Sequence, residues 1–119
     1  RQLDGAQSPI EALPAIAQAV SGRMKIMVDS GFRRGSDIVK ALALGADMVF
    51  VGRATLYGAT AGGEEGALHA LNLLKSEVSR VIALLGVNSL DELGPQYLRF
   101  DPPHEFLQTA PPVTRQRAG

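Results

Sequence analysis

The sequence predicts an α/β fold built on one βαβ unit, in which a helix connects two short parallel strands. Two short segments, 25–28 and 48–51, are apolar apart from Lys25, and the segment between them has the apolar spacing of an amphipathic helix. Gly45 ends that helix and Gly52 follows the second strand. Because so short a connection joins only neighbouring or nearly neighbouring strands by a crossover, we expect the strands to be parallel.

A first helix is expected from about residue 8 to residue 21. It begins with an N-cap serine, Ser8, a proline at the first helical position, and Glu11 three residues beyond the cap, which together form a capping box. Pro14 removes one backbone donor and is expected to bend or restart the helix, and Gly22 is expected to end it. The expected buried stripe consists of Leu13, Ile16, Ala17 and Val20.

The remaining helices follow from caps and spacing. Ser36 is the expected N-cap of the helix between the strands, whose inward positions are Ile38, Val39 and Leu42. Residues 54–63 are expected to hold a short helical turn that points its amide end back toward the strand ends and closes at two glycines. A long helix is expected over residues 64–85, and a second capping box at Ser89 predicts a short helix. The expected apolar stripe of the long helix is Leu68, Leu71, Leu74, Val78, Val81, Ile82 and Leu85.

Each strand of the βαβ unit is followed by a glycine and an arginine. Gly31 and Arg33 follow the first strand, and Gly52 and Arg53 follow the second. Because the carboxyl ends of parallel strands lie at one edge of a sheet, the two loops are expected to form one basic, amide-rich site for a phosphate group. Turn glycines and surface arginines are the alternative for either pair alone, but their repetition at successive strand ends favours the phosphate site.

Other polar residues carry weaker signals. Asp29 ends the first strand, where its carboxylate either accepts hydrogen bonds from ligand hydroxyls or caps loop amides, and both interpretations stay open. Arg34 is expected to point to solvent, and His69 and His104 are expected to be structural or exposed. No spacing of His, Asp and Glu is typical of a metal site.

Composition limits the class of protein. The chain has 119 residues, 45% of them apolar and 20% charged, a formal net charge of zero and no cysteine. These values predict a globular protein without disulfides or the basic face of a nucleic-acid binder. No apolar run is long enough to span a bilayer, so we expect a soluble chain. The absence of cysteine is compatible with a reducing cytoplasm, and we expect a cytoplasmic protein. A first residue other than Met, and only two strands, suggest a fragment of a larger fold.

Four segments, in order and spacing, resemble the FMN-dependent 2-hydroxy-acid oxidase and dehydrogenase family. They are RQLD at 1–4, DSGFRRGSD at 29–37, KALALGA at 40–46 and VGR at 51–53, and the match continues through Leu98. This resemblance implies a (β/α)8 TIM barrel, in which the chain is a C-terminal fragment that supplies the last two βα units and the terminal helices. Residues 1–99 would belong to the barrel and residues 100–119 would form an extended, proline-rich tail.

The resemblance also implies an FMN site and one substrate contact. The ribityl chain and phosphate of FMN would bind at the loop from Asp29 to Arg33, with Asp29 on the ribityl hydroxyls, and Gly52 and Arg53 would complete the phosphate site. Arg1 matches the family's arginine that binds the substrate carboxylate, and the family's active-site histidine would lie three positions before it, outside this chain. The implied cofactor-binding residues are Asp29, Ser30, Gly31, Phe32, Arg33, Gly52 and Arg53.

By this resemblance the parent protein would oxidise an (S)-2-hydroxy acid to the 2-oxo acid. The runs DSGFR and GRATLYG are most similar to the mandelate dehydrogenase branch, although many relatives have glycine where this chain has Ser30. A glycolate or lactate oxidase of the same family is the alternative. The resemblance also implies a homo-oligomer, with membrane attachment in some relatives through a segment absent here. From the residues alone, another phosphate-binding barrel, such as an isomerase, and a non-enzymatic assembly fragment stay open.

Overall fold

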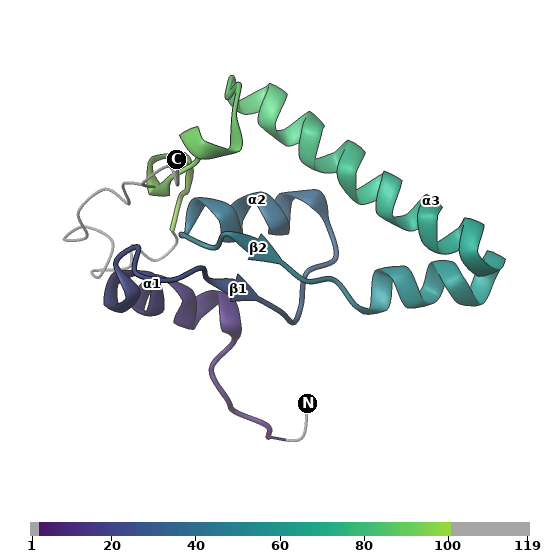
Figure 1. Ribbon diagram of the computed structural model, residues 1–119, viewed down its shortest axis with the longest axis horizontal. Coiled ribbons are helices and arrows are strands. Elements are labelled where there is room, and N and C mark those ends of the chain that lie inside the picture. Colours follow the sequence, from purple (N-terminus) through teal and green to yellow (C-terminus); the bar gives the residue numbers. More distant parts are fainter. Residues whose placement is uncertain (1–2, 101–119) are drawn as a thin grey trace.

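The computed structural model describes residues 3–100, which form a parallel βαβ unit with further helices around it (Figure 1). The expected α/β class is therefore present, whereas Arg1, His104 and almost all of the expected tail lie outside the described residues. The elements in chain order are α1 (Pro9–Val20), β1 (Met27–Val28), α2 (Gly35–Ala43), β2 (Met48–Val49), α3 (Arg53–Leu85) and two short 3₁₀ helices, η1 (Leu90–Glu92) and η2 (Pro95–Tyr97).

The two strands pair in parallel, as predicted, but each is shorter than its apolar segment. Met27 lies opposite Met48, and Val28 lies opposite Val49. At the carboxyl end of the pair, Phe50 N donates a hydrogen bond of 2.8 Å to Val28 O. In this register the two strands end beside each other, so the loops that follow them start at the same edge of the sheet.

The amino edge of the sheet is held by Asp47. Its Oδ2 accepts a hydrogen bond of 2.9 Å from Ile26 N, and its Oδ1 pairs with Lys25 Nζ at 3.1 Å. Asp47 N in turn donates to Ile26 O at 2.8 Å. Because side-chain and backbone contacts join the same two segments, they favour one register over its neighbours.

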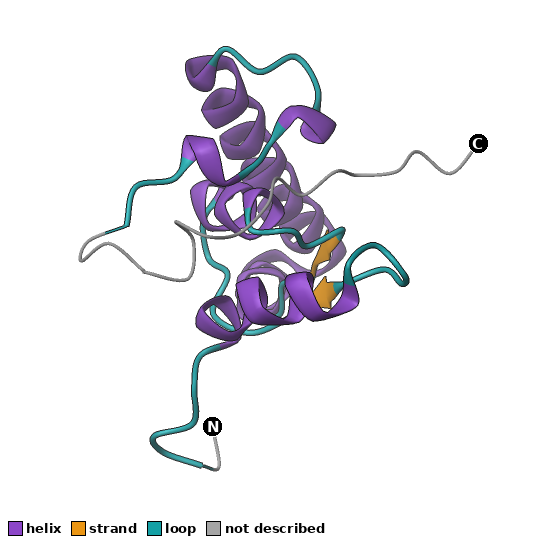
Figure 2. Ribbon diagram, turned by 90° about the vertical axis from the view of Figure 1, so that its left-hand side faces the viewer, coloured by secondary structure: helices purple, strands orange, loops and turns teal. Residues whose placement is uncertain are grey.

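Only one face of the sheet is covered. Val28 is buried, whereas Met27 and Met48 on the opposite face are 61% and 51% exposed. Helices form most of the described chain, and the strands form a small pair among them (Figure 2). The exposed methionines therefore present an apolar surface on the side of the sheet away from the packed helices.

Two apolar clusters meet on α2. One joins α2 to α1 and β1, and the other joins α2 to α3 and the segment after it. The first cluster consists of Leu13, Val28, Phe32, Ala41, Leu44 and Ala46. The second consists of Val39, Leu42, Ala43, Val87 and Leu93. Helix α2 is thus the central element of this part of the chain.

Helix α1 begins with the expected capping box, in which the Glu11 carboxylate accepts hydrogen bonds from Ser8 N at 3.1 Å and Ser8 Oγ at 2.7 Å. The helix does not restart at Pro14: it runs unbroken from Pro9 to Val20, with Leu13 anchored in the core. It ends in a left-handed turn at Ser21 and Gly22, close to the expected position.

Helix α3 consists of two helical segments joined at Gly62 and Gly63, where non-helical backbone angles produce the turn seen in Figure 1. The first segment is longer than the short turn expected there. In the second, the carboxyl-terminal part of the predicted stripe packs against α2, but Leu68 and Leu71 are exposed because the helix extends beyond α2.

Candidate cofactor site

The loops that follow β1 and β2 begin next to each other at the carboxyl edge of the sheet. The hydrogen bond from Phe50 N to Val28 O joins the ends of the two strands, so Asp29 begins one loop beside the start of the other. Arg33 and Arg53 are exposed residues of this part of the chain. The register thus places the two predicted loops at one edge.

The first loop turns sharply because two consecutive residues have positive φ. These residues are Ser30, with φ 84°, and Gly31, with φ 90°. Asp29 Oδ1 accepts a hydrogen bond of 2.7 Å from Ser30 N, so this carboxylate does cap a loop amide. Its other oxygen has no hydrogen-bond partner among residues 3–100, which leaves one oxygen for a ligand hydroxyl.

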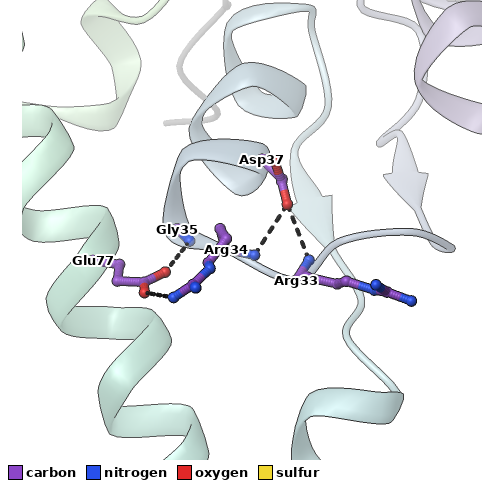
Figure 3. Close-up of polar contacts among 5 residues, drawn as sticks. All are labelled: Arg33, Arg34, Gly35, Asp37 and Glu77. Atoms are coloured by element: carbon purple, nitrogen blue, oxygen red, sulfur yellow. Dashed lines mark hydrogen bonds and ion pairs between the residues drawn. The ribbon is translucent and has the colours of Figure 1, made fainter.

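Phe32 anchors the same loop to the apolar core. Its ring is buried in the first apolar cluster together with Leu13 and Val28. Any contact of Phe32 with a cofactor is therefore restricted to its backbone. Arg33 follows, and its side chain extends away from both Asp37 and Glu77 (Figure 3). Its guanidinium forms no hydrogen bond or ion pair with the described part of the chain.

The amino end of α2 is closed by two carboxylates. Asp37 Oδ2 accepts hydrogen bonds from Arg33 N at 3.1 Å and Arg34 N at 3.0 Å, and Glu77 Oε2 accepts one of 2.7 Å from Gly35 N (Figure 3). The prediction of Ser36 as N-cap was wrong, because the N-cap residue is Arg34, two residues earlier, and the helix begins at Gly35. These three amides are already bonded and do not offer an anion site.

Glu77 reaches this helix end from α3. Its Oε1 also accepts a hydrogen bond of 2.9 Å from the Arg34 guanidinium. The hydrogen bond from Gly35 N, followed by that from Arg34, lowers the pKa of Glu77. Arg34 is exposed, as expected, but it is paired with Glu77. Sequence reasoning missed Glu77, because a glutamate on a helix 42 residues beyond Gly35 has no local signal of this contact.

The amino end of α3 has the opposite character. Within residues 3–100 no side chain caps it at Gly52, and Thr55 Oγ1 and Leu56 N both donate to Gly52 O. The first amides of a helix have no partner within the helix and attract anions. A methyl group on Gly52 would meet no atom within 4 Å, so packing inside the described chain does not require glycine there. This open helix end is the better place for a phosphate.

The other predicted residues add little to this site. Arg1 lies outside the described residues, and His69 is exposed on α3. Among residues 3–100, no group of three or more His, Asp and Glu side chains is placed to hold a metal ion. A separate property is that none of the described helices is both long enough and apolar enough to cross a membrane.

The fold is a parallel α/β unit whose carboxyl edge carries the open amino end of α3 and the exposed Arg33 and Arg53. The model of the FMN-dependent dehydrogenase family matches residues 1–100, and the chain therefore belongs to that family. It is 54% identical over 100 residues to an (S)-mandelate dehydrogenase of Pseudomonas putida, covering 83% of this chain and 25% of that protein. It is 44% identical over 98 residues to an L-lactate oxidase of Nostoc sp., covering 82% and 27% respectively.

A solved structure shows the same fold over most of the chain. It is the crystal structure of the monotopic membrane protein (S)-mandelate dehydrogenase, with a TM-score of 0.76 and 53% sequence identity over 83% of this chain and 26% of that one. The chain thus spans about a quarter of the length of the relatives that it matches.

Proposed function

We propose that the protein to which this chain belongs oxidises an (S)-2-hydroxy acid of mandelate type to the corresponding 2-oxo acid, with FMN as its cofactor. Membership of the FMN-dependent dehydrogenase family supports the cofactor, and similarity to an (S)-mandelate dehydrogenase supports the substrate class. One observation carries the proposal. The loop of Arg33, whose guanidinium has no partner among the described residues, lies at the same edge of the sheet as the open amino end of α3.

The residues fit the phosphate end of FMN. A dianionic phosphate prefers open amides and fork-shaped guanidinium groups. Arg33, Arg53 and the first amides of α3 offer both, whereas the amino end of α2 is occupied by Asp37 and Glu77. At Gly31 and Gly52 a Cβ would meet no atom within 4 Å, so a ligand can approach the backbone closely.

The ribityl chain would lie beside the first loop. Asp29 keeps one carboxylate oxygen on Ser30 N and offers the other to ribityl hydroxyls. Ser30 and Gly31 would contribute backbone at the turn, and Phe32 only its backbone. FMN, when bound, supplies the acceptor for the two electrons removed from the hydroxy acid.

Arg1 is the proposed substrate contact in this chain. An arginine binds a carboxylate through two parallel hydrogen bonds, which would orient the hydroxy acid. A histidine earlier in the parent protein would take the hydroxyl proton. The fold proposed for the parent is a (β/α)8 barrel, in which residues 1–99 supply the last two βα units and the exposed Met27 and Met48 face its interior.

Two further features of the parent protein belong to the same proposal. We propose a homo-oligomer, and a cytoplasmic protein that associates with a membrane if it shares the monotopic character of its (S)-mandelate dehydrogenase neighbour. The L-lactate oxidase relative makes lactate the second candidate substrate.

The test is FMN affinity in the full-length protein, measured by quenching of flavin fluorescence. Arg33→Ala and Arg53→Ala should each weaken binding by about tenfold or more, because each removes a charged hydrogen-bond donor. The control is Arg23→Ala, since Arg23 lies on the amino side of the sheet and bonds the end of α1. Unchanged FMN affinity in both variants would contradict binding of the FMN phosphate at this edge of the sheet.

A further inference from the structure

We propose that Glu77 is a positioning residue of the phosphate site: from α3 it holds the amino end of α2 so that Arg33 is presented to the cofactor. This inference rests on the proposed function, since it assumes that Arg33 binds the FMN phosphate. It adds a residue that is distant in sequence and has no place among the predicted ligands.

The contact is a latch with two hydrogen bonds. The two oxygens of Glu77 divide between the backbone of Gly35, at 2.7 Å, and the Arg34 guanidinium, at 2.9 Å. The side chain of Glu77 is only 29% exposed, against 73% for Arg34. A methyl group on Gly35 would lie within 3 Å of the backbone of Glu77 and Val78, so the helices can approach this closely only at a glycine.

The latch acts on Arg33 through a very short segment. Phe32, immediately before Arg33, is fixed in the apolar core, and Gly35, two residues after it, is fixed by Glu77. Between these anchors, Asp37 binds the amides of both Arg33 and Arg34. The backbone of Arg33 is therefore held on both sides, while its side chain is left without a partner among the described residues (Figure 3).

Glu77 also removes a competing anion site. Without its carboxylate, the N–H of Gly35 and the guanidinium of Arg34 would both be open at the amino end of α2. An amide at a helix amino end next to an arginine attracts phosphate. With Glu77 in place, Gly35 N and Nη1 of Arg34 are bonded to its carboxylate, so its negative charge occupies this helix end and the phosphate is left with Arg33 and the open end of α3.

The experiment is a double-mutant cycle in the full-length protein, with FMN affinity read by fluorescence and the apoprotein's unfolding midpoint read separately. Glu77→Ala should weaken FMN binding by about tenfold, because it frees the Arg33 loop. Glu77→Gln, which keeps an acceptor for Gly35 N, should recover part of that loss. Glu64→Gln is the matched control, since Glu64 is an exposed carboxylate on the same helix that forms no hydrogen bond or ion pair with α2.

The decisive comparison is made in the Arg33→Ala background. If Glu77 acts through Arg33, Glu77→Ala should cause little further loss of FMN affinity there, although it should still lower the unfolding midpoint. An equal loss in both backgrounds would overturn the positioning role and leave the proposed function intact. If Arg33→Ala itself leaves FMN affinity unchanged, both the inference and the assignment of Arg33 to the phosphate fail.

Discussion

Gly58 and Gly66 face each other across the turn in α3, and each backbone fills the space that a Cβ on the other would need. The turn itself is made by Gly62 and Gly63. Because the first segment of α3 begins at the proposed phosphate site, this contact between two glycines sets the direction of its open amino end.

Alanine at this contact should therefore destabilise the protein. We expect Gly58→Ala and Gly66→Ala each to lower the free energy of unfolding by about 1–3 kcal/mol, because the added methyl group must displace backbone. Gly62→Ala is the control, with an expected change within about 0.5 kcal/mol, since its φ is not positive and a Cβ there meets nothing within 4 Å. Denaturant unfolding measures all three, and equal stability of Gly58→Ala and Gly62→Ala would contradict the close contact.

The corrected cap of α2 gives a second prediction. Asp37 accepts two backbone hydrogen bonds at the helix start, whereas Ser36 lies inside the first turn. Asp37→Ala should cost about 1 kcal/mol of stability and Ser36→Ala less than about 0.5 kcal/mol. The unfolding midpoints of the two variants decide between the caps. A larger loss of stability in Ser36→Ala than in Asp37→Ala would instead support Ser36 as the N-cap.

The strained turn after β1 gives a third prediction. Ser30 has a φ of 84°, a conformation in which glycine carries no Cβ penalty. Ser30→Gly should raise the free energy of unfolding by about 0.5–1 kcal/mol, because relief of this strain exceeds the added freedom of the unfolded chain. Gly31→Ala, at φ 90°, should have the opposite effect although space is available. A loss of stability in Ser30→Gly would mean that the serine hydroxyl holds the turn.

Acid should weaken the latch between α2 and α3. The pKa of Glu77 is lowered in the folded protein from an ordinary value of 4.5, mainly by the hydrogen bond from Gly35 N. Its contribution is therefore fully present above that value and is lost as the pH falls through the lower, folded-state pKa. Thermal unfolding between about pH 7 and pH 3 should show a steeper loss for the wild type than for Glu77→Gln. Parallel curves would contradict an ionised latch.

The sequence was informative where local rules decide the structure. The capping box at Ser8 and the glycines at residues 62 and 63 predicted helix ends, and two apolar segments predicted the parallel pair. It misplaced the start of α2 because the amides there are satisfied partly by Glu77, a tertiary partner. It also assigned Leu71 to a buried stripe, since helical spacing shows a face but not how far the covering helix extends.

The candidate site was predictable to a similar degree. The pairing of two loops at one sheet edge follows from strand order, and the structure has that arrangement. The pattern did not show that one helix end is closed and the other open, because this depends on carboxylates that come from inside α2 and from α3. That difference is what now directs the proposed phosphate toward Gly52 and Arg53.

The most direct test is the visible absorption spectrum of the full-length protein, recorded without oxygen before and after (S)-mandelate is added. The proposed function predicts oxidised flavin bands that bleach when (S)-mandelate is added. The same measurement with L-lactate tests the second candidate substrate. Flavin that stays oxidised with both acids would contradict the proposed substrate class. A folded full-length protein that binds no flavin, even when FMN is supplied, would contradict the central claim.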